Sequence, residues 1–332
     1  MDTLTSIGYG LVYIAVGLAM LGVAKLIRDV VTPYKLDDEL TGKDNPALGL
    51  AMSGYFLGVM IVFLGAALGP EPATRPSVRE LGFELLTVCG YTLGGVVLLN
   101  IGNVLLDRCI LSSFKIHKEI VDDRNAGTGA VVFGSYIATA MVVAGAIYGE
   151  VTIAWWHGVV SALVFFVLGQ VTLILFGALY RLITKFDLHA EIERDNVAAG
   201  VAFGLSIVAI GIVLLKASGQ DFAAIEMAIG EQKAAEIAVV DAAGAMSAAT
   251  FDPETGDLIV TPTEKWRYAL VDFGYYAAGG FIVIALLRRV TDALLLPGTT
   301  IFEEIGRDKN LAAALIEGSV ACGVASMVYF MI

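Results

Sequence analysis

The chain has 332 residues, of which 57% are hydrophobic and 16% are charged, and its formal net charge is −12 at pH 7. Soluble globular domains carry about 25% charged residues, so this composition argues against a soluble fold. The negative charge argues against nucleic acid as a partner. The mean hydropathy of +0.78 instead indicates a protein whose solvent is the lipid bilayer.

Eight apolar stretches are long enough to cross a bilayer as helices. A spanning helix needs about 20 apolar residues, because the hydrocarbon layer is about 30 Å thick and a helix rises about 1.5 Å per residue. In chain order the predicted helices cover residues 7–24, 47–68, 85–106, 126–149, 159–180, 197–215, 268–287 and 311–332. We therefore predict an all-α integral membrane protein with about eight transmembrane helices.

The distribution of basic residues predicts how the helices are oriented. Lys and Arg in short loops remain on the cytoplasmic side of a membrane, and most of the 21 basic residues follow the first, third, fifth and seventh stretches. This asymmetry predicts that both termini lie outside and that the four odd-to-even loops lie in the cytoplasm. Trp155, Trp156 and Trp266 fall where the fifth and seventh helices enter from the outer side, as expected for an interfacial aromatic belt.

The four loops predicted to be cytoplasmic share one pattern. An aromatic residue precedes an aliphatic one by two positions, a Glu-aliphatic pair follows, and an Asn comes five or six positions after the Glu; the fourth copy has Thr299 in place of the aromatic. The Glu and Asn residues are Glu39 and Asn45, Glu119 and Asn125, Glu191 and Asn196, and Glu304 and Asn310. Self-similarity of this kind defines an architecture. It predicts four like helical hairpins that cross the membrane in the same sense, as parallel repeats.

Two roles are open for this motif. In the architectural role, each Asn caps the helix that it opens, and the small residues four positions later allow close helix packing; these are Gly49, Gly129, Gly200 and Ala314. In the functional role, the polar atoms line a site, and the four glutamates form an acidic ring at the mouth of a central path.

The run from Glu191-Ile192 to Asp195-Asn196-Val197-Ala198-Ala199-Gly200 resembles the YjfL-type family of bacterial inner-membrane proteins, a domain of unknown function. The resemblance covers nearly the whole chain outside residues 217–266. Family members typically carry two hairpins, so this chain resembles two fused units, at residues 1–150 and 151–332. The resemblance implies a bacterial cytoplasmic membrane and a gene neighbourhood linked to envelope stress and amine-ligase enzymes, with no established activity.

An acidic insertion at residues 217–266 separates the sixth and seventh stretches. Its first half has apolar residues at helical spacing. Residues 250–260 have the alternation and the Pro- and Gly-containing turn of a β-hairpin. We expect a small ordered cap on the outer side, whose acidic surface is either simply solvated or gathers cations.

The sequence lacks the usual signatures of catalysis and metal binding. It has three isolated cysteines, three histidines (His117, His157 and His189), and neither an HExxH nor a GxSxG motif. We therefore expect no enzyme activity, no cofactor and no metal site.

Polar residues inside the predicted helices are candidate functional residues, because a polar group in lipid is costly. Glu317 is the foremost, since only one of four equivalent repeat positions carries a carboxylate; it either hydrogen-bonds between helices, with Asn100 as one expected partner, or handles ions or protons. The other polar residues predicted near the same depth are Asn100, Asn103, Gln170, Ser53, Ser135 and Ser206.

Two functional hypotheses follow. The first is an ion or small-solute channel or transporter, and the alternative is a non-transporting structural or envelope-stress membrane scaffold. A water-filled polar path would favour transport, whereas a dry and densely packed interior would favour the scaffold. Besides the bilayer, the candidate partners are an ion or small solute and a second copy of the chain.

Overall fold

The structure, a computed structural model, describes residues 3–68, 77–148, 155–219, 260–295 and 299–331, together with Ile225, Ile229 and Lys233. All regular secondary structure in these residues is helical. Eight of the described helices are long and apolar enough to cross a membrane, which confirms the predicted fold class. The expected β-hairpin at residues 250–260 lies almost wholly outside the described residues, as do the side chains of Trp155 and Trp156.

The four hairpins consist of eight long helices. They are α1 (Thr3–Val31), α2 (Pro46–Ala67), α3 (Val78–Leu105), α5 (Ala126–Ile147), α6 (Trp155–Ile183), α8 (Val197–Ser218), α10 (Pro262–Leu295) and α11 (Leu311–Met331). Short segments connect the two helices of each hairpin. They are η1 (Asp38–Gly42), η2 (Leu106–Ile110), α4 (Ile116–Val121), α7 (Leu188–Glu193) and η4 (Glu303–Arg307), of which the three η segments are π-helical turns.

The first helix of each hairpin extends beyond the apolar stretch that predicts it. The first stretch ends at residue 24, but α1 continues to Val31 and includes Arg28. The predicted helix ends too early because the charged residues Lys25 and Arg28, which follow residue 24, are typical of a loop. In the structure Arg28 reaches polar partners on other helices, so the helix can continue with the charge inside its span.

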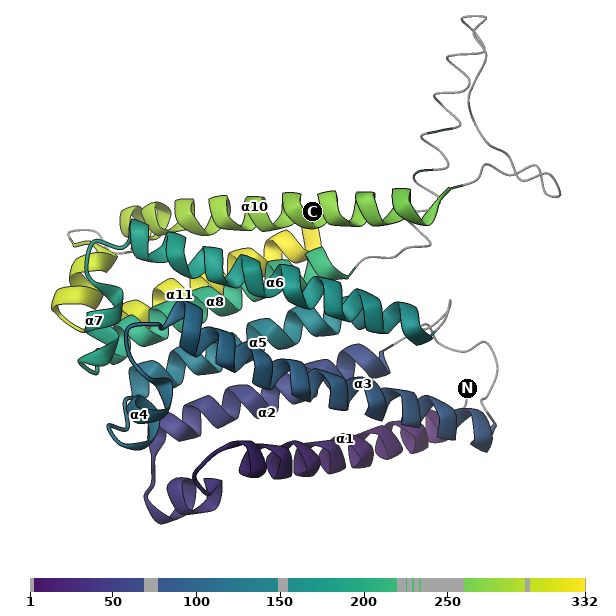
Figure 1. Ribbon diagram of the computed structural model, residues 1–332. Helices are drawn as coiled ribbons and strands as arrows, with labels where there is room; N and C mark the ends of the chain where they lie inside the picture. The colour runs from purple at the N-terminus through teal and green to yellow at the C-terminus, as the bar shows by residue number, and fades with distance from the viewer. Residues whose placement is uncertain are drawn as a thin grey trace, which may run out of the picture.

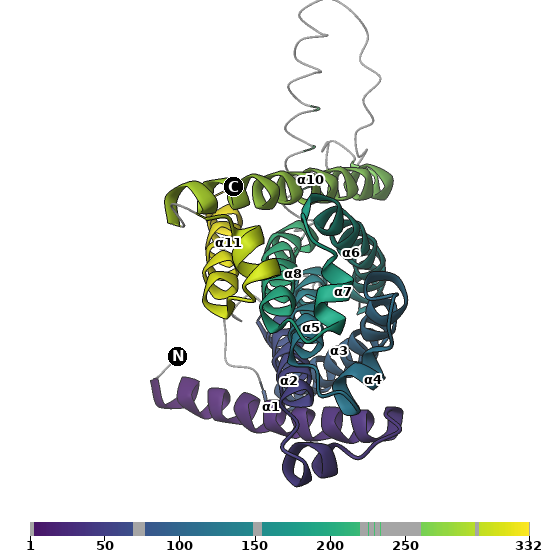
Figure 2. The ribbon, with the colours of Figure 1, turned by 90° about the vertical axis from the view of Figure 1, so that its left-hand side faces the viewer.

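The second helices of the four hairpins pack side by side in one row, in the order α2, α5, α8 and α11 (Figures 1 and 2). The first helices flank this row: α3 lies against α2 and α5, α6 against α5 and α8, and α10 against α8 and α11. Helix α1 packs on α2 and α3 at one end of the row. Among the described residues, α2 and α11 share no such interface, so the row is open and does not surround a central path.

Glycines bring the helices of the row into backbone contact. A Cβ atom added at Gly54 of α2 would lie 2.5 Å from Cα of Phe133 on α5, and one at Gly211 of α8 would lie 2.6 Å from Cα of Ala138. Such short distances exclude any larger side chain, as in membrane helices that associate through small residues. Gly49 does not have the expected packing role, because a Cβ there would meet nothing within 4 Å.

The loops that carry the repeated motif lie at one end of the molecule, which we call the loop end. Figure 1 shows α4 and α7 there, and both marked chain termini toward the opposite end. Every hairpin therefore runs to the loop end and back in the same sense. The arrangement agrees with the predicted parallel repeats.

Candidate functional site

The repeated motif folds into the same tight loop in all four copies. The residue before each Asn has a left-handed backbone, with φ of 48° at Asp44, 52° at Arg124, 58° at Asp195 and 52° at Lys309. This turn allows the Asn backbone N–H to donate to the carbonyl of the motif Glu, at 2.8 to 3.2 Å. The Asn side-chain oxygen then accepts from the first turn of the following helix, for example from Thr128 N at 2.9 Å, and acts as the helix cap.

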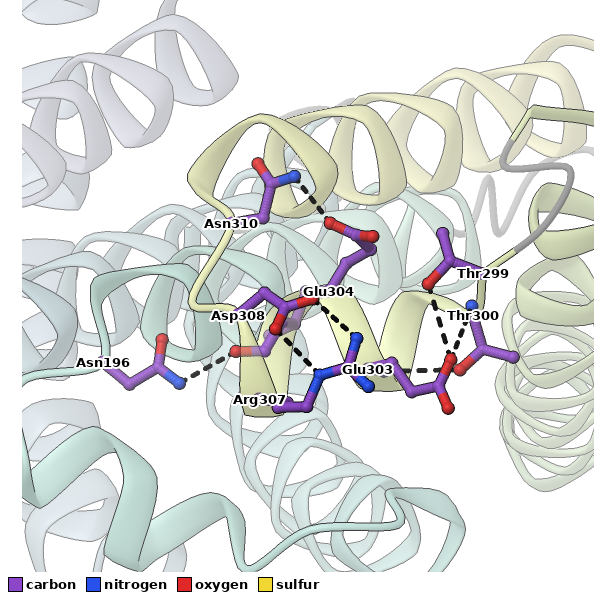
Figure 3. A network of polar contacts seen from close by, with 9 residues as sticks. Asn196, Thr299, Thr300, Glu303, Glu304, Arg307, Asp308 and Asn310 are labelled. Atoms are coloured by element: carbon purple, nitrogen blue, oxygen red, sulfur yellow. Dashed lines mark hydrogen bonds and ion pairs between the residues drawn. The ribbon is translucent and has the colours of Figure 1, made fainter.

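The same asparagines connect each hairpin to the next. The Asn Nδ2 donates to the backbone carbonyl of the aliphatic residue that follows Glu in the next copy of the motif. The three contacts join Asn45 to Ile120 at 2.8 Å, Asn125 to Ile192 at 2.6 Å, and Asn196 to Ile305 at 2.9 Å. Figure 3 shows the last of these beside the bond from Asn310 to Glu304, which lies within the fourth copy at the end of the row. We call this series the Asn ladder.

Ring contacts run parallel to the Asn ladder. The aromatic residue of one copy contacts the fourth motif position of the next. The pairs are Tyr34 with His117, Phe114 with His189, and Phe186 with Phe302, with ring centroids 5.3, 6.3 and 6.5 Å apart. This role of the two histidines was not predicted from the sequence. The sequence feature that could have indicated it is a ring side chain one position after the first aliphatic residue of the motif, present in the second, third and fourth copies.

The first and last copies of the motif each lack one of the two ring-contact residues, namely the one that would have no partner in the row. The first copy has Asp37 at the position that would receive a ring, and the last copy has Thr299 at the position that would supply one. Thr299 Oγ1 instead lies 3.5 Å from Glu303 Oε2 in its own copy (Figure 3). Terminal units of repeat proteins are commonly atypical in this way. The exception in the fourth motif copy is therefore explained by its place at the end of an open row.

The four motif glutamates do not share one environment. Glu39 lies 2.5 Å from Lys43 Nζ, and this hydrogen bond lowers the pKa of the Glu39 carboxyl. Burial raises the pKa of Glu119, which accepts from Asn125 Nδ2 at 2.8 Å. Glu191 and Glu304 likewise accept from the Asn of their own copy. The glutamates thus lie along the open row and bond within their own loops. They do not form the acidic ring that was one of the two roles open from the sequence.

Some of the predicted polar residues inside the helices make hydrogen bonds within one helix, and others bond between helices. Ser53 is exposed and donates to Gly49 O of its own helix, and the buried Ser206 donates to Ala202 O. Each hydroxyl therefore donates its hydrogen within its own helix and not to a neighbouring helix. Gln170 on α6 does connect two helices, since its Nε2 donates to Thr139 Oγ1 on α5 at 3.0 Å.

The remaining members of that predicted set lie on three helices, α3, α5 and α11. Ser135 on α5 and Glu317 on α11 are both buried, with 4% and 3% of their surfaces exposed. Asn103 on α3 has a buried Oδ1 with no hydrogen-bond donor among the described residues. Asn100 was expected near Glu317, but its partners are Arg28 and Tyr55, because α3 flanks the other end of the row from α11.

A polar cluster around Arg28 was missed by the sequence analysis. Arg28 Nη1 donates to Asn100 Oδ1 at 3.0 Å, and its Cζ lies 5.9 Å from the ring centres of Tyr55 and Tyr136. Tyr55 in turn donates to Ala24 O at 3.1 Å. Arg28 lies four residues past the predicted end of the first helix, at residue 24. Recognising that α1 continues past residue 24 would have placed this Arg on the same helix face as Ala24, one turn away.

Two apolar grooves lie between helices in the half of the molecule away from the loop end. The larger one, of about 510 Å³, lies between α3, α5 and α6 and is lined by Tyr91, Gly94 and Leu163 among others. The second, of about 450 Å³, includes Leu64, Lys216 and Tyr329. The described residues contain no group of three or more His, Cys, Asp or Glu that could hold a metal ion.

Comparison with known proteins gives a family and no activity. The family described as Domain of Unknown Function (DUF350) matches the chain twice, over residues 2–147 and 154–332. A UPF0719 transmembrane protein of Aquifex aeolicus (strain VF5) is 23% identical over 201 residues, which cover 60% of this chain and 69% of the relative. No solved structure matches the chain. The chain therefore belongs to the DUF350 family of transmembrane proteins of unknown function, and it carries two family units in succession.

Proposed function

We propose that the protein is a non-transporting membrane scaffold, an open slab of four hairpins that the Asn ladder locks together at the loop end. The observation that carries this proposal is the backbone contact between neighbouring helices of the row, for example at Gly54 and Gly211. Helices that touch at their backbones leave no room between them for water or a solute.

The interior of the row supports the scaffold over a channel. On α5, in the middle of the row, only Ala126, Phe133 and Met141 are partly exposed, and every other residue of the helix is buried. A conducting path needs a continuous polar lining or a ring of charges. Here the motif glutamates are engaged by their own loops, while Ser206 bonds within its own helix and Gln170 bonds to Thr139 alone.

The proposal includes a location and an orientation. The Lys and Arg distribution favours a bacterial cytoplasmic membrane with the loop end in the cytoplasm and both termini outside. In that orientation the Asn ladder presents a rigid row of short segments to the cytoplasm. A row fixed by hydrogen bonds from Asn side chains to main-chain carbonyls and by ring contacts suits a surface on which other proteins assemble, because little conformational entropy remains to be lost on binding.

Transport remains the second candidate because of one observation, the burial of Glu317. An ionised carboxylate inside the membrane is costly unless it is paired or hydrated, and such residues commonly mark ion or proton pathways. Glu317 is 3% exposed on α11, and the corresponding positions of the other row helices carry no carboxylate. A transport role would make flux depend on this residue.

Flux across reconstituted liposomes distinguishes the two functions. We expect proteoliposomes to pass protons, monovalent cations and polyamines no faster than protein-free liposomes, because the row encloses no path. The Glu317→Gln variant, which keeps the side-chain shape, is the matched control. Flux well above the protein-free level that falls or loses its pH dependence in Glu317→Gln would contradict the scaffold and support transport.

A further inference from the structure

Arg28 is a positive charge inside a membrane-spanning helix, and no ion pair of its side chain is found among the residues that the structure describes. It lies in the apolar span from Ile7 to Val31. Its side-chain partners in the described part of the chain are Asn100, Tyr34, Tyr55 and Tyr136, all of which are neutral. On the same helix, one turn earlier, Lys25 does have a counter-ion, since its Nζ lies 2.7 Å from Asp37 Oδ1.

Two hydrogen-bond donors in this cluster have no acceptor among the described residues. They are the N–H of Arg28 Nε and the O–H of Tyr136, both of which are buried. Tyr136 is only 2% exposed. A guanidinium has five N–H donors and accepts no hydrogen bond, so Asn100 Oδ1 and the Tyr34 hydroxyl satisfy only some of them. Leaving buried donors unpaired is costly, and a ligand that accepts from both would remove that cost.

The surrounding residues hold the guanidinium in place. Tyr55 and Tyr136 pack edge to face with centroids 5.2 Å apart, and the guanidinium lies at the same distance from each ring. Asn100 Nδ2 donates to Val96 O at 2.8 Å, which orients its Oδ1 toward Arg28. The arginine is therefore pre-organised by four different helices or loops, as a binding residue should be.

The place of Arg28 along α1 gives access to the headgroup region of a bilayer. Arg28 is partly exposed. It precedes Val31, the last residue of the helix, by three positions, or about 4.5 Å at about 1.5 Å per residue. The adjacent Val30 is 85% exposed on the outside of α1, toward lipid. Phospholipid phosphates lie at the ends of membrane-spanning helices.

We propose that Arg28 and Tyr136, positioned by Asn100 and Tyr55, bind the anionic phosphate of a phospholipid headgroup or of a free phosphate. The fork of N–H groups on a guanidinium matches the oxygens of a phosphate and forms charge-assisted hydrogen bonds with them. A bound phosphate would supply the missing negative charge and accept from the two unpaired donors. This site does not depend on whether the protein transports anything.

Ligand-dependent thermal stability of the purified full chain tests the site. Phosphatidylglycerol is compared with diacylglycerol of the same acyl chains, which lacks the phosphate, and inorganic phosphate alone is a separate arm. We expect phosphatidylglycerol to raise the unfolding temperature of the wild type and diacylglycerol to have no such effect. Inorganic phosphate that reproduces an Arg28-dependent rise would identify free phosphate as the ligand.

Three variants locate the effect. Arg28→Gln should weaken phosphate binding about tenfold or more, and Tyr136→Phe, which removes only the hydroxyl, should weaken it by roughly threefold to tenfold. Lys25→Gln on the same helix should bind like the wild type. If Arg28→Gln does not fold, Arg28→Lys replaces it, because it keeps the charge but loses the fork. Equal stabilisation of the wild type and of the Arg28 and Tyr136 variants, or no response to either phosphate source, would overturn the proposal.

Discussion

Gly54→Val should destabilise the protein by about 3 kcal/mol or more and leave little folded protein in the membrane. The Cβ of any side chain at this position would lie 2.5 Å from Cα and 2.7 Å from the carbonyl oxygen of Phe133. Both atoms belong to the backbone of α5 and cannot rotate away, so α2 and α5 would have to separate. Overpacking of a tight interior commonly costs about 1–3 kcal/mol even where side chains can adjust. Thermal unfolding in detergent and the yield of folded protein measure the effect.

Gly49→Val is the matched control in the same helix. A Cβ at Gly49 meets nothing within 4 Å, so this variant carries the same change in helix propensity without the clash. We expect its stability to stay within about 1 kcal/mol of the wild type. If the two variants lost equal stability, the close approach of α2 and α5 would not be what holds the row together.

Asn125→Asp should cost about 2–4 kcal/mol at neutral pH, although it is almost isosteric. The Asp oxygen can still cap α5 at Thr128 N, but the donor to Ile192 O and to Glu119 Oε2 is lost. Two carboxylates would then face each other at a site where Asn125 is 1% exposed. Protonation of either carboxyl restores a donor, and burial beside a second carboxylate raises the pKa of both groups, so the loss of stability should shrink as the pH falls. Chemical unfolding measured across pH 4 to 8 provides the comparison.

Asn310→Asp provides the control at the open end of the row. Asn310 caps its helix and donates to Glu304, and among the described residues its Nδ2 makes no ladder bond to another copy of the motif. It is also partly exposed, so water can solvate the new carboxylate. We expect a loss of about 1 kcal/mol or less. Equal effects at positions 125 and 310 would mean that the bonds between hairpins add nothing to the helix caps.

The sequence was sufficient to predict the hairpins but not their arrangement. Helix number and the parallel sense of the hairpins follow from apolar length and the repeated motif, which are local properties. Whether four like hairpins close into a ring or form a row depends on which helix faces touch. The cue was present at the ends of the motif series, where Asp37 and Thr299 replace the ring-contact residues. These two exceptions can be interpreted only when it is known that the aromatic residue of each copy contacts a ring in the next copy.

The candidate site was predicted in part for similar reasons. The capping role of Asn45 and its counterparts follows from their position before each helix. Their second role is to donate to a carbonyl in the next hairpin, as Asn45 does to Ile120, 75 residues away. The acceptor belongs to the main chain, so a sequence pattern cannot reveal it. The Arg28 cluster depends on where α1 ends, and helix ends are the least certain feature of a sequence-based prediction.

The distance between α2 and α11 tests the open row most directly. Leu50 and Leu315 each lie five positions after the motif Asn of their helix, and both are exposed, so nitroxide labels at these two positions report equivalent points. The labels require a background in which Cys89, Cys109 and Cys322 are replaced, and dilution with unlabelled protein removes distances between molecules.

Neighbouring helices lie about 8–10 Å apart, so three steps along a row give about 24–30 Å, somewhat less if the row bends. We predict an electron–electron distance above about 20 Å for the Leu50 and Leu315 pair, and a clearly shorter one for the adjacent pair Val201 and Leu315. A distance for the first pair as short as that for the second would mean that the hairpins close into a ring, and would contradict the account.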